Sequence, residues 1–220
     1  MKEVATKDGS ITFYNEQFGE HYHSRSGAIE EALEKYVKPS NIIELARKES
    51  EVVIFDICFG LGYNTLMALH EIKKVNPCCK ITVLVFENHK EILQKISGIN
   101  LGYSKYNLIK QSINNLMDDK LTTTSDNVTI TFYLGDAVSE IHKVKQKADA
   151  VFFDPFSMKK CPEMWSVEFF KEIRKRMKTG ARLTNFTCSK LARSQMERAG
   201  FKVIDGPYVG RNTPSTIAVS

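Results

Sequence analysis

The stretch that decides the fold is Ile54-Phe55-Asp56-Ile57-Cys58-Phe59-Gly60-Leu61-Gly62-Tyr63-Asn64. The apolar run from Val52 to Phe55 predicts a buried strand that ends beside Asp56, and a helical pattern begins at Thr65. A strand, a glycine-rich turn and a helix form a nucleotide-binding corner of α/β proteins, where glycine lets the backbone approach a ligand closely.

The details of this turn restrict the ligand. The turn lacks the Gly-Lys-Ser/Thr of a phosphate-binding loop and the third glycine of the dinucleotide fingerprint. An acid followed by two glycines suits an adenosyl ligand without a pyrophosphate, such as S-adenosylmethionine. A tight packing turn is the alternative interpretation, because two glycines alone are a weak signal.

The composition is that of an ordinary globular protein. Of the 220 residues, 42% are hydrophobic and 26% are charged, which favours a single domain with a full core. No apolar run is long enough to span a membrane, and the polar first ten residues do not resemble a signal peptide. The five cysteines show no Cys-x-x-Cys spacing, so we expect no metal site, no disulfide and a cytoplasmic location. The net charge of +5 permits an anionic partner such as RNA.

Strand and helix patterns alternate from Val52 onward. This alternation predicts a Rossmann-like α/β fold with a mostly parallel, seven-stranded sheet and helices on both faces. Ligands bind to such sheets at the C-terminal ends of the strands. The predicted strands are 52–57, 81–86, 128–134, 149–154, 181–187, 201–204 and 214–219, and the predicted helices are 63–75, 89–97, 105–118, 136–143, 165–178 and 188–199.

Residues 1–40 are predicted to form an extension that precedes a ligand-binding domain at 41–220. The turn pair Asp8-Gly9, followed by alternating apolar residues, indicates a hairpin, and a helical pattern comes after it. The predicted parts are a hairpin over 3–14 and a helix from Ala28 to Tyr36, capped by Ser24 or Ser26 and ended by Pro39.

Two further strand ends carry acids. Glu87 closes the second predicted strand at a distance from Gly62 where an acid often binds ribose hydroxyls; the alternative is a surface glutamate. Asp136 follows the third strand, where it could accept a hydrogen bond from an adenine amine, cap the following helix, or do both.

The fourth predicted strand ends in Asp154-Pro155-Phe156-Ser157, the strongest catalytic candidate. Pro155 has no N–H and a fixed φ, so strand pairing stops there and Asp154 is pushed to an extended geometry. A carboxylate beside such a bend can orient an amine nucleophile and help to take its proton. The alternative is a plain transition from strand to loop.

Together these motifs resemble those of class I S-adenosylmethionine-dependent methyltransferases. One family fits best: the methyltransferase domain of the bifunctional 5-methylaminomethyl-2-thiouridine tRNA-modification protein, which also occurs as stand-alone proteins. The resemblance extends over about residues 8–220. It is carried by Asp8-Gly9-Ser10, by Phe18-Gly19-Glu20-His21-Tyr22-His23-Ser24, by Gly27-Ala28-Ile29-Glu30, and by Asp154 to Lys160 with Pro162-Glu163-Met164-Trp165.

The resemblance implies methylation of an aminomethyl group on the wobble uridine of certain tRNAs, from 5-aminomethyl- to 5-methylaminomethyl-uridine. The bifunctional relatives carry an additional FAD-dependent domain. A chain of 220 residues is too short for that domain, so we expect no FAD and a separate enzyme that supplies the amine. Cys58, at the place of the family's first glycine, and Met158 and Cys161 depart from the family pattern. Cofactor affinity and substrate identity therefore do not follow from the resemblance alone.

Roles for the candidate residues follow from the implied reaction. Because the methyl group is already activated by a positive sulfur, the protein mainly has to hold a neutral amine behind it. We assign this orienting role to Asp154, with the geometry of Pro155 and Phe156. The predicted cofactor contacts are Asp56, Gly60 and Gly62 for the methionine part, Glu87 for the ribose, Asp136 for the adenine, Asn64 as a further contact, and, by resemblance, the segment from Ser24 to Gly27 folded over the cofactor.

Basic and aromatic residues are candidates for substrate contacts. Lys159 and Lys160, beside the proposed site, are predicted to bind tRNA phosphates. Trp165 could stack on a base, although a core aromatic is the commoner explanation. His21 and His23 are predicted to be surface histidines that alternate between opposite faces. Other basic residues that could extend the phosphate path are Arg174, Lys175, Arg176, Lys190 and Arg193.

Two other functions are compatible with the sequence. A polyamine aminopropyltransferase shares the sheet and the amine nucleophile but uses decarboxylated S-adenosylmethionine, and Lys159 and Lys160 would repel its polycationic substrate. A catalytically silent RNA-binding protein is the second alternative, because Cys58 interrupts the glycine motif. Cofactor binding would discriminate between these possibilities.

Overall fold

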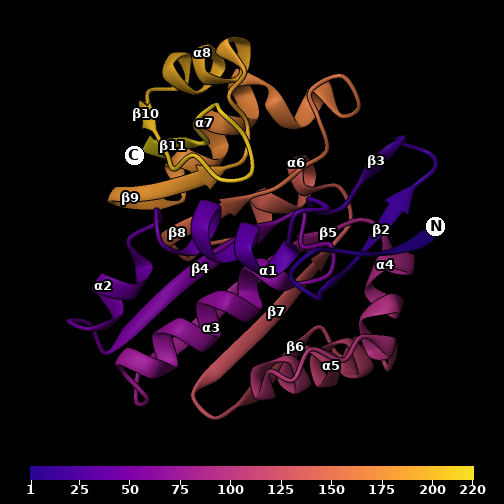
Figure 1. Cartoon of the computed structure of the whole chain (residues 1–220). Helices are drawn as coiled ribbons and strands as arrows, with labels where there is room; N and C mark the ends of the chain where they lie inside the picture. Colours follow the sequence, from indigo (N-terminus) through magenta and orange to yellow (C-terminus); the bar gives the residue numbers. More distant parts are fainter.

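One large sheet of eight strands forms the centre of the molecule, as the computed structural model of residues 1–220 shows (Figure 1). Its strands are β4 (Glu51–Ile57), β5 (Lys80–Glu87), β6 (Thr122–Ser125), β7 (Val128–Leu134), β8 (Ala148–Phe153), β9 (Met177–Asn185), β10 (Lys202–Asp205) and β11 (Thr216–Val219). They are arranged in the order β10-β11-β9-β8-β4-β5-β7-β6. The pairings among the five central strands, β9 to β7, are parallel, and those toward the two edges are antiparallel.

The predicted Rossmann-like fold is confirmed, and all seven predicted strands are present. The strand that the sequence did not predict is β6, which pairs with β7 at the edge of the sheet. Its sequence, Thr122-Thr123-Thr124-Ser125, is polar and mostly exposed, so it shows no apolar alternation that could have revealed it.

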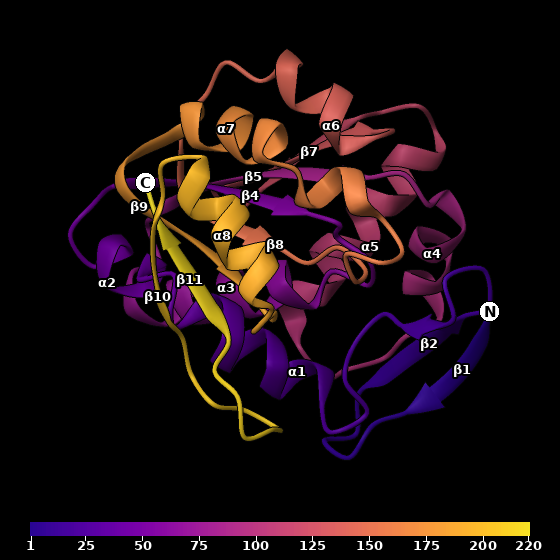
Figure 2. The same ribbon diagram turned by 90° about the horizontal axis from the view of Figure 1, so that it is seen from above.

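Helices cover both faces of the sheet, as the view from above shows (Figure 2). Alternate residues of β5 reach the two cores: Val83 and Val85 belong to one cluster of buried residues, and Leu84 and Phe86 to the other. None of the helices is both long enough and apolar enough to cross a membrane. The helices after residue 40 are α2 (Ile42–Ala46), α3 (Tyr63–Val75), α4 (Lys90–Lys95), α5 (Ser104–Met117), α6 (Ala137–Glu140), α7 (Val167–Lys175) and α8 (Lys190–Arg198), with short 3₁₀ turns at 96–98, 141–143 and 162–165.

The predicted helices 89–97 and 136–143 end in 3₁₀ turns, and a third predicted helix differs further in its bounds. The sequence suggested a helix over 165–178, but residues 162–165 form a separate 3₁₀ turn and α7 ends at Lys175. Met177 is already paired with Ala148, because β9 starts there instead of at residue 181, with an irregularity in the pairing before Ala150. The apolar side chains at the end of the helical pattern therefore belong to a strand.

The ends of three central strands lie level with one another. Ile57 of β4 pairs with Phe86 of β5 on one side and with Phe153 of β8 on the other. The next residues of the three strands, which include Glu87 and Asp154, therefore leave the sheet at the same edge. The segments that follow β4, β5 and β8 diverge at this edge, which is where ligands bind to open α/β sheets.

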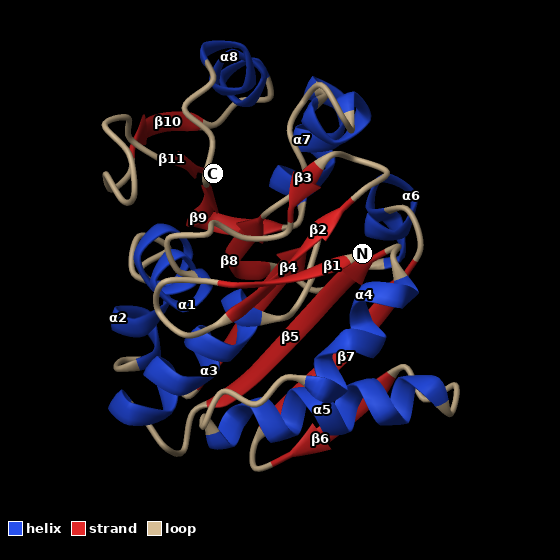
Figure 3. Ribbon diagram, turned by 45° about the vertical axis from the view of Figure 1, so that its right-hand side comes forward, coloured by secondary structure: helices blue, strands red, loops and turns tan.

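The N-terminal segment forms a small sheet that is followed by a helix (Figure 3). The strands β1 (Lys2–Ala5), β2 (Ile11–Asn15) and β3 (Glu20–His21) pair antiparallel, which confirms the predicted hairpin. The helix begins as α1 (Ala28–Glu31) and continues in wider π-type turns as η1 (Ala32–Val37). Buried residues of η1, such as Tyr36, share a core with α3, so this segment packs against the main sheet.

The predicted cap of this helix is wrong. Neither Ser24 nor Ser26 accepts a hydrogen bond from the first turn of α1. Instead, the Asp8 carboxylate, from the hairpin turn, accepts hydrogen bonds from the backbone N–H groups of Ile29 (3.0 Å) and Glu30 (3.1 Å). A cap from a residue distant in the sequence satisfies the same free N–H groups as a local serine would.

Candidate active site

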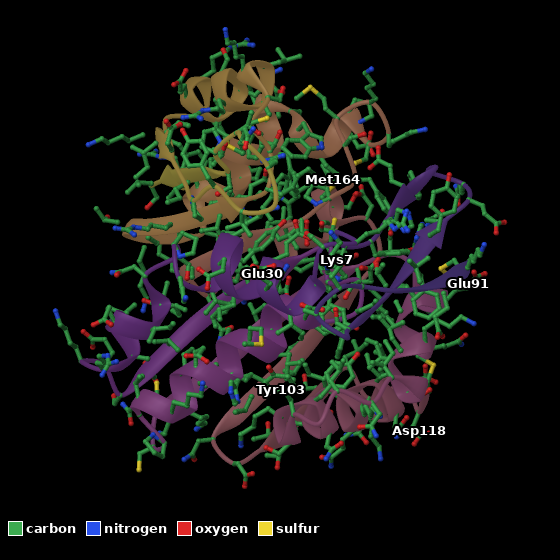
Figure 4. All side chains as sticks on the ribbon, viewed as in Figure 1. Lys7, Glu30, Glu91, Tyr103, Asp118 and Met164 are labelled. Carbon is green, nitrogen blue, oxygen red and sulfur yellow. The ribbon has the colours of Figure 1, made fainter.

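A cavity of about 500 Å³ lies at the edge where the central strands end. The turn after β4 contributes Cys58 and Gly60, and the ends of β5, β7 and β8 contribute further residues. The N-terminal segment supplies another wall, and Met164, labelled in Figure 4, lines the cavity from the loop before α7. The sequence-predicted residues that line the cavity are Ser24, Gly60, Glu87, Asp136, Asp154, Pro155 and Phe156.

The charge of the cavity is opposite to that of the whole chain. The chain carries a net charge of +5, but Arg25 is the single lysine or arginine among the lining residues. Six carboxylates share these walls: Glu20, Glu31, Glu87, Asp136, Asp154 and Glu163. An acidic cavity in a basic protein favours a cationic ligand and disfavours a phosphate.

Asp154 is held by two side chains from different helices. The buried hydroxyl of Tyr36 donates to one carboxylate oxygen, and the amide of Asn64 donates to the other (3.2 Å). The pKa of Asp154 is raised to about 7, because burial removes water from the carboxylate and the negative charge of Glu31 lies near; the hydrogen bonds from Tyr36 and Asn64 act in the opposite direction. At neutral pH Asp154 is therefore poised to exchange a proton.

A second carboxylate reaches the cavity from the N-terminal helix. Glu31 accepts a hydrogen bond from the backbone N–H of Ser24 (2.8 Å) and forms an ion pair with Lys35 (2.7 Å), and both charged side chains are nearly buried. Sequence reasoning missed Glu31 as a site residue, and it also missed Tyr36. Glu30, the neighbour of Glu31, belongs to the N-terminal motif on which the resemblance rests, which is the signal that could have indicated Glu31.

Glu87 is a buried acceptor for the backbone of two loops. Its carboxylate accepts hydrogen bonds from the N–H groups of Gly60 (2.9 Å), Asn88 (2.9 Å) and His89 (2.8 Å). Burial raises the pKa of Glu87, and the N–H group of Gly60 opposes that shift. The surface-glutamate alternative is wrong, because Glu87 is only 7% exposed. The side chain fixes the glycine turn against the end of β5, and its predicted contact with a ribose stays a prediction.

Asp136 caps the helix that follows it. Its side chain accepts a hydrogen bond from the backbone N–H of Val138 (3.1 Å), so the capping prediction is confirmed. The residue is also exposed and lines the cavity. Its predicted contact with an adenine stays a prediction.

Four other predicted cofactor residues lie behind the cavity wall. Asp56 is fully buried, and its carboxylate accepts a hydrogen bond from the Thr65 hydroxyl (2.6 Å). Burial raises the pKa of Asp56 to about 8, while the Thr65 hydroxyl opposes that shift. Asn64 is buried as well and reaches Asp154, as described above. Asp56 and Asn64 are thus buried residues that support the site without lining the cavity.

The other two of the four are Gly62 and Gly27, where contacts with other residues of the protein already require a glycine. Gly62 has a left-handed φ of 77°, and a Cβ there would lie 2.6 Å from the ring of Phe59. A Cβ on Gly27 would lie 2.6 Å from a carboxylate oxygen of Asp8. The packing-turn interpretation accounts for Gly62, and the helix cap accounts for Gly27; their cofactor contacts stay predictions.

Cys58 occupies a position that favours glycine. Its φ is 66°, in the left-handed region, and its side chain lines the cavity. Burial raises the pKa of the Cys58 thiol, so it is a neutral group at physiological pH. The departure from the family's glycine therefore adds a small uncharged side chain to the wall.

The prediction of surface histidines is wrong. His21 and His23 both line the cavity, so they do not point to opposite faces, and His23 is only 7% exposed. Burial lowers the pKa of His23 to about 4, so its ring is neutral. Its Nε2 atom has no hydrogen-bond partner in the protein and lies near Gly60. A buried ring nitrogen without a partner indicates that a ligand completes this wall.

Aromatic residues close the cavity on the side of the N-terminal sheet. The ring of Phe18 stacks on Phe156 (4.6 Å between centroids), and Tyr22 contacts the same ring (5.2 Å). Glu20 accepts hydrogen bonds from the backbone and the hydroxyl of Ser157. The loop that begins at Asp154 is thus attached to the N-terminal segment.

The predicted substrate contacts divide into buried and exposed residues. Trp165 is 2% exposed, and its indole N–H donates to the carbonyl of Phe156 (3.0 Å), which favours a core role over stacking on a base. Lys159, Lys160 and Lys190 are exposed, and none of the three forms an ion pair. Arg174 is likewise exposed and without an ion pair, whereas Lys175 and Arg176 pair with Glu172, and Arg193 pairs with Asp205.

Comparison with known proteins identifies the family. A family model described as S-adenosyl-L-methionine-dependent methyltransferase matches residues 102–220, more than half of the chain. The chain belongs to this family. A crystal structure of MNMC2 from Aquifex aeolicus has a TM-score of 0.84 and 32% sequence identity, over 99% of this chain and 69% of that chain. These matches confirm the fold and the resemblance inferred from the sequence motifs.

Curated relatives are longer than this methyltransferase. An uncharacterized protein of Methanocaldococcus jannaschii is 32% identical over 217 residues, which cover 98% of this chain and 58% of that protein. The tRNA 5-methylaminomethyl-2-thiouridine biosynthesis bifunctional protein MnmC of Leptospira interrogans is 24% identical over 94% of this chain and 34% of its own length. Spermidine synthase from Thermotoga maritima, with a TM-score of 0.53 and 12% identity, shares the fold alone.

The residues of the cavity fit the cofactor that the family implies. S-adenosylmethionine carries a positive sulfur and an ammonium group, and six carboxylates line the cavity. Gly60 lines the wall, and the unpartnered Nε2 atom of His23 lies beside it. We expect Glu31, His23 and Gly60 to surround the methionine part, and Glu87 and Asp136 to lie toward the adenosine.

Proposed function

We propose that this methyltransferase converts 5-aminomethyl-uridine to 5-methylaminomethyl-uridine at the wobble position of tRNA. The observation that carries the proposal is the placement of the Asp154 carboxylate, which Tyr36 and Asn64 hold at the wall of an acidic cavity. The relative from Leptospira interrogans is a tRNA 5-methylaminomethyl-2-thiouridine biosynthesis protein, which supports a substrate of this class.

The acidic cavity suits an amine that must arrive as a cation and react as a neutral base. A free alkylamine is mostly protonated at neutral pH and has no lone pair to offer. S-adenosylmethionine supplies an electrophilic methyl group. Asp154, with a pKa of about 7, accepts a hydrogen bond from the amine and takes its surplus proton. Phe156 and Pro155, the next residues of the loop, line the same cavity.

The charge pattern also suits a nucleic-acid substrate. Carboxylates inside the cavity exclude phosphates, whereas Lys159 and Lys160 outside it are free to contact them. A single unstacked nucleotide could thus present its base and amine to the cavity while its backbone stays outside. Trp165 is not needed for this arrangement.

The source of the amine is part of the proposal. The reaction described here uses S-adenosylmethionine and no FAD, so an aminomethyl group must be present on the uridine before methylation. We therefore propose that a separate enzyme supplies this group in the cytoplasm. Cells that hold the chain but lack that enzyme would accumulate no methylated product.

The direct test is mass spectrometry of tRNA nucleosides after incubation with the protein and S-adenosylmethionine. The substrate is tRNA that bears 5-aminomethyl-uridine, and Asp154→Asn and Asp154→Ala are the matched variants. We expect the wobble nucleoside to gain one methyl group, and the gain to fall at least 100-fold in both variants, which is the lower end of the usual effect of losing a general base. Cofactor binding without any methyl gain would reject this acceptor.

A parallel incubation separates the aminopropyltransferase alternative. Decarboxylated S-adenosylmethionine replaces the methyl donor, and a polyamine replaces the tRNA. No aminopropyl transfer is expected, because the family that the chain belongs to is one of methyltransferases and spermidine synthase shares the fold alone.

A further inference from the structure

We propose that Tyr36 is a positioning residue of the reaction: its hydroxyl fixes the Asp154 carboxylate so that an oxygen stays available to the amine. Tyr36 lies in the N-terminal helix, outside the sheet and outside residues 102–220, which match the family model. The inference rests on the proposed function for the identity of the amine but not for the contact itself.

The position of the Tyr36 hydroxyl is fixed from several sides. The side chain is 1% exposed, and its ring packs edge-to-face on Phe152 (6.4 Å between centroids). The hydroxyl of Thr184, on β9, donates to the Tyr36 carbonyl (3.2 Å). The residue lies in the π-type turns of η1. Such turns are rare in proteins, and those that occur are frequently found at functional sites. The phenol therefore reaches Asp154 from a rigid support.

The two groups that donate hydrogen bonds to Asp154 come from two different helical segments. Tyr36 belongs to η1 and donates to Oδ1, whereas Asn64 belongs to α3 and donates to Oδ2. A carboxylate has two lone pairs on each oxygen, so one donor on each leaves acceptor capacity for a ligand in the cavity. With both rotational ends of the carboxylate occupied, the group cannot turn away from the cavity that it lines.

Because charged groups surround Asp154, the hydrogen bond from the Tyr36 hydroxyl affects the ionisation of its carboxylate. The charged and titratable groups that act on Asp154 are Glu31 and Lys35 of the N-terminal helix, Asp56 of β4 and Cys58 of the next turn. Burial and Glu31 favour the neutral acid, and the hydrogen bond from Tyr36 favours the anion. Removing that donor must therefore raise the pKa of Asp154.

The Tyr36→Phe variant tests this directly. Loss of a hydrogen bond to a charged group should move the titration of Asp154 upward by about one to two pH units. The acid limb of kcat against pH should move by the same amount, so that kcat at pH 7 falls about tenfold and recovers toward pH 9. KM should change little, because the phenol does not line the cavity.

A second readout does not require turnover. The carboxyl carbon of Asp154 can be followed by ¹³C NMR in aspartate-labelled protein and assigned by its absence in Asp154→Asn. Tyr36→Phe and Asn64→Ala should both raise its titration midpoint. Tyr63→Phe is the control, because this variant also loses a buried hydroxyl, one that donates to the carbonyl of Ile11 (2.6 Å) outside the cavity.

The outcomes are distinguishable. An unchanged Asp154 midpoint in Tyr36→Phe, or a loss of kcat that is equal at every pH, would overturn the positioning role. A wild-type protein that methylates no aminomethyl-uridine would reject the proposed function, and the NMR titration would still decide the role of Tyr36. Thermal unfolding and cofactor binding establish that each variant is folded, and Asn64→Ala decides the question if Tyr36→Phe is not.

Discussion

Replacement of Asp56 by asparagine should stabilise the protein at pH 8 and flatten the pH dependence of its free energy of unfolding. Asp56 is fully buried, one of its oxygens has no partner, and its pKa is raised from the ordinary value of 3.8 to about 8. Between these two values the unfolded chain has released a proton that the folded protein still holds. Each pH unit in this window therefore lowers the free energy of unfolding by about 1.4 kcal/mol.

The sign follows from the direction of the shift. A raised pKa means that this contribution is harmless below about pH 4, grows as the pH rises, and reaches its limit above pH 8. The accumulated loss at pH 8 is on the order of 5 kcal/mol, and about 4 kcal/mol of it builds up between pH 5 and pH 8. Asparagine has no such proton to lose. Its amide can keep the acceptor for Thr65 but leaves a buried N–H unpaired, which costs about 1–3 kcal/mol at every pH.

Urea unfolding of the wild type and of Asp56→Asn, at half-unit steps from pH 4.5 to pH 8.5, measures the difference. We expect the variant to be less stable or equal at pH 4.5 and clearly more stable at pH 8. Other buried acids, such as Glu87 and Asp154, titrate in both proteins and cancel in the comparison to first order. Parallel curves for the two proteins would refute the reasoning, because they would mean that Asp56 is ionised in the folded state.

Two other predictions concern the surface. Lys159→Ala combined with Lys160→Ala should weaken tRNA binding and lower the slope of log K against log salt by about 1–2; the same result for Lys175→Ala, whose ammonium is already paired, would show that the effect is not local. Asp8→Ala should lower the free energy of unfolding by about 1–2 kcal/mol through loss of the helix cap, as measured by urea unfolding at pH 7. Because hydrogen bonds from Ser10 and its neighbours hold the pKa of Asp8 near 2 despite partial burial, this difference should be present above pH 4 and vanish as the pH falls toward 2.

The arrangement of the sheet could be predicted because periodicity reports which face of a segment is buried. Runs such as Val83 to Phe86 alternate between two cores, and the sequence shows both their length and their ends. Acids at strand ends could be assigned to one edge for the same reason, and Glu87 and Asp154 do meet there. The β6 strand could not be predicted from periodicity, because one of its faces contacts no core.

The partners of the site residues could not be predicted, because they come from segments far apart in the sequence. Tyr36 is 118 positions from Asp154, and Glu20 is 137 positions from Ser157. A buried tyrosine on a helix carries the same local signal whether its hydroxyl meets water, a carbonyl or a catalytic acid. The burial of His23 was missed for a related reason: a polar residue in a short irregular segment has no periodicity from which burial follows.

The contact between Gly27 and Asp8 has a consequence for how related sequences should be read. A Cβ at position 27 would collide with the carboxylate at position 8, so the two positions constrain each other across the hairpin. In a family alignment they should covary: homologues that keep an acid at the hairpin turn should keep glycine at the helix start, and those that cap the helix by another residue should be free to lose it. Invariance of Gly27 would then record an architectural coupling between two segments, and an evolutionary profile alone would misassign it to ligand recognition.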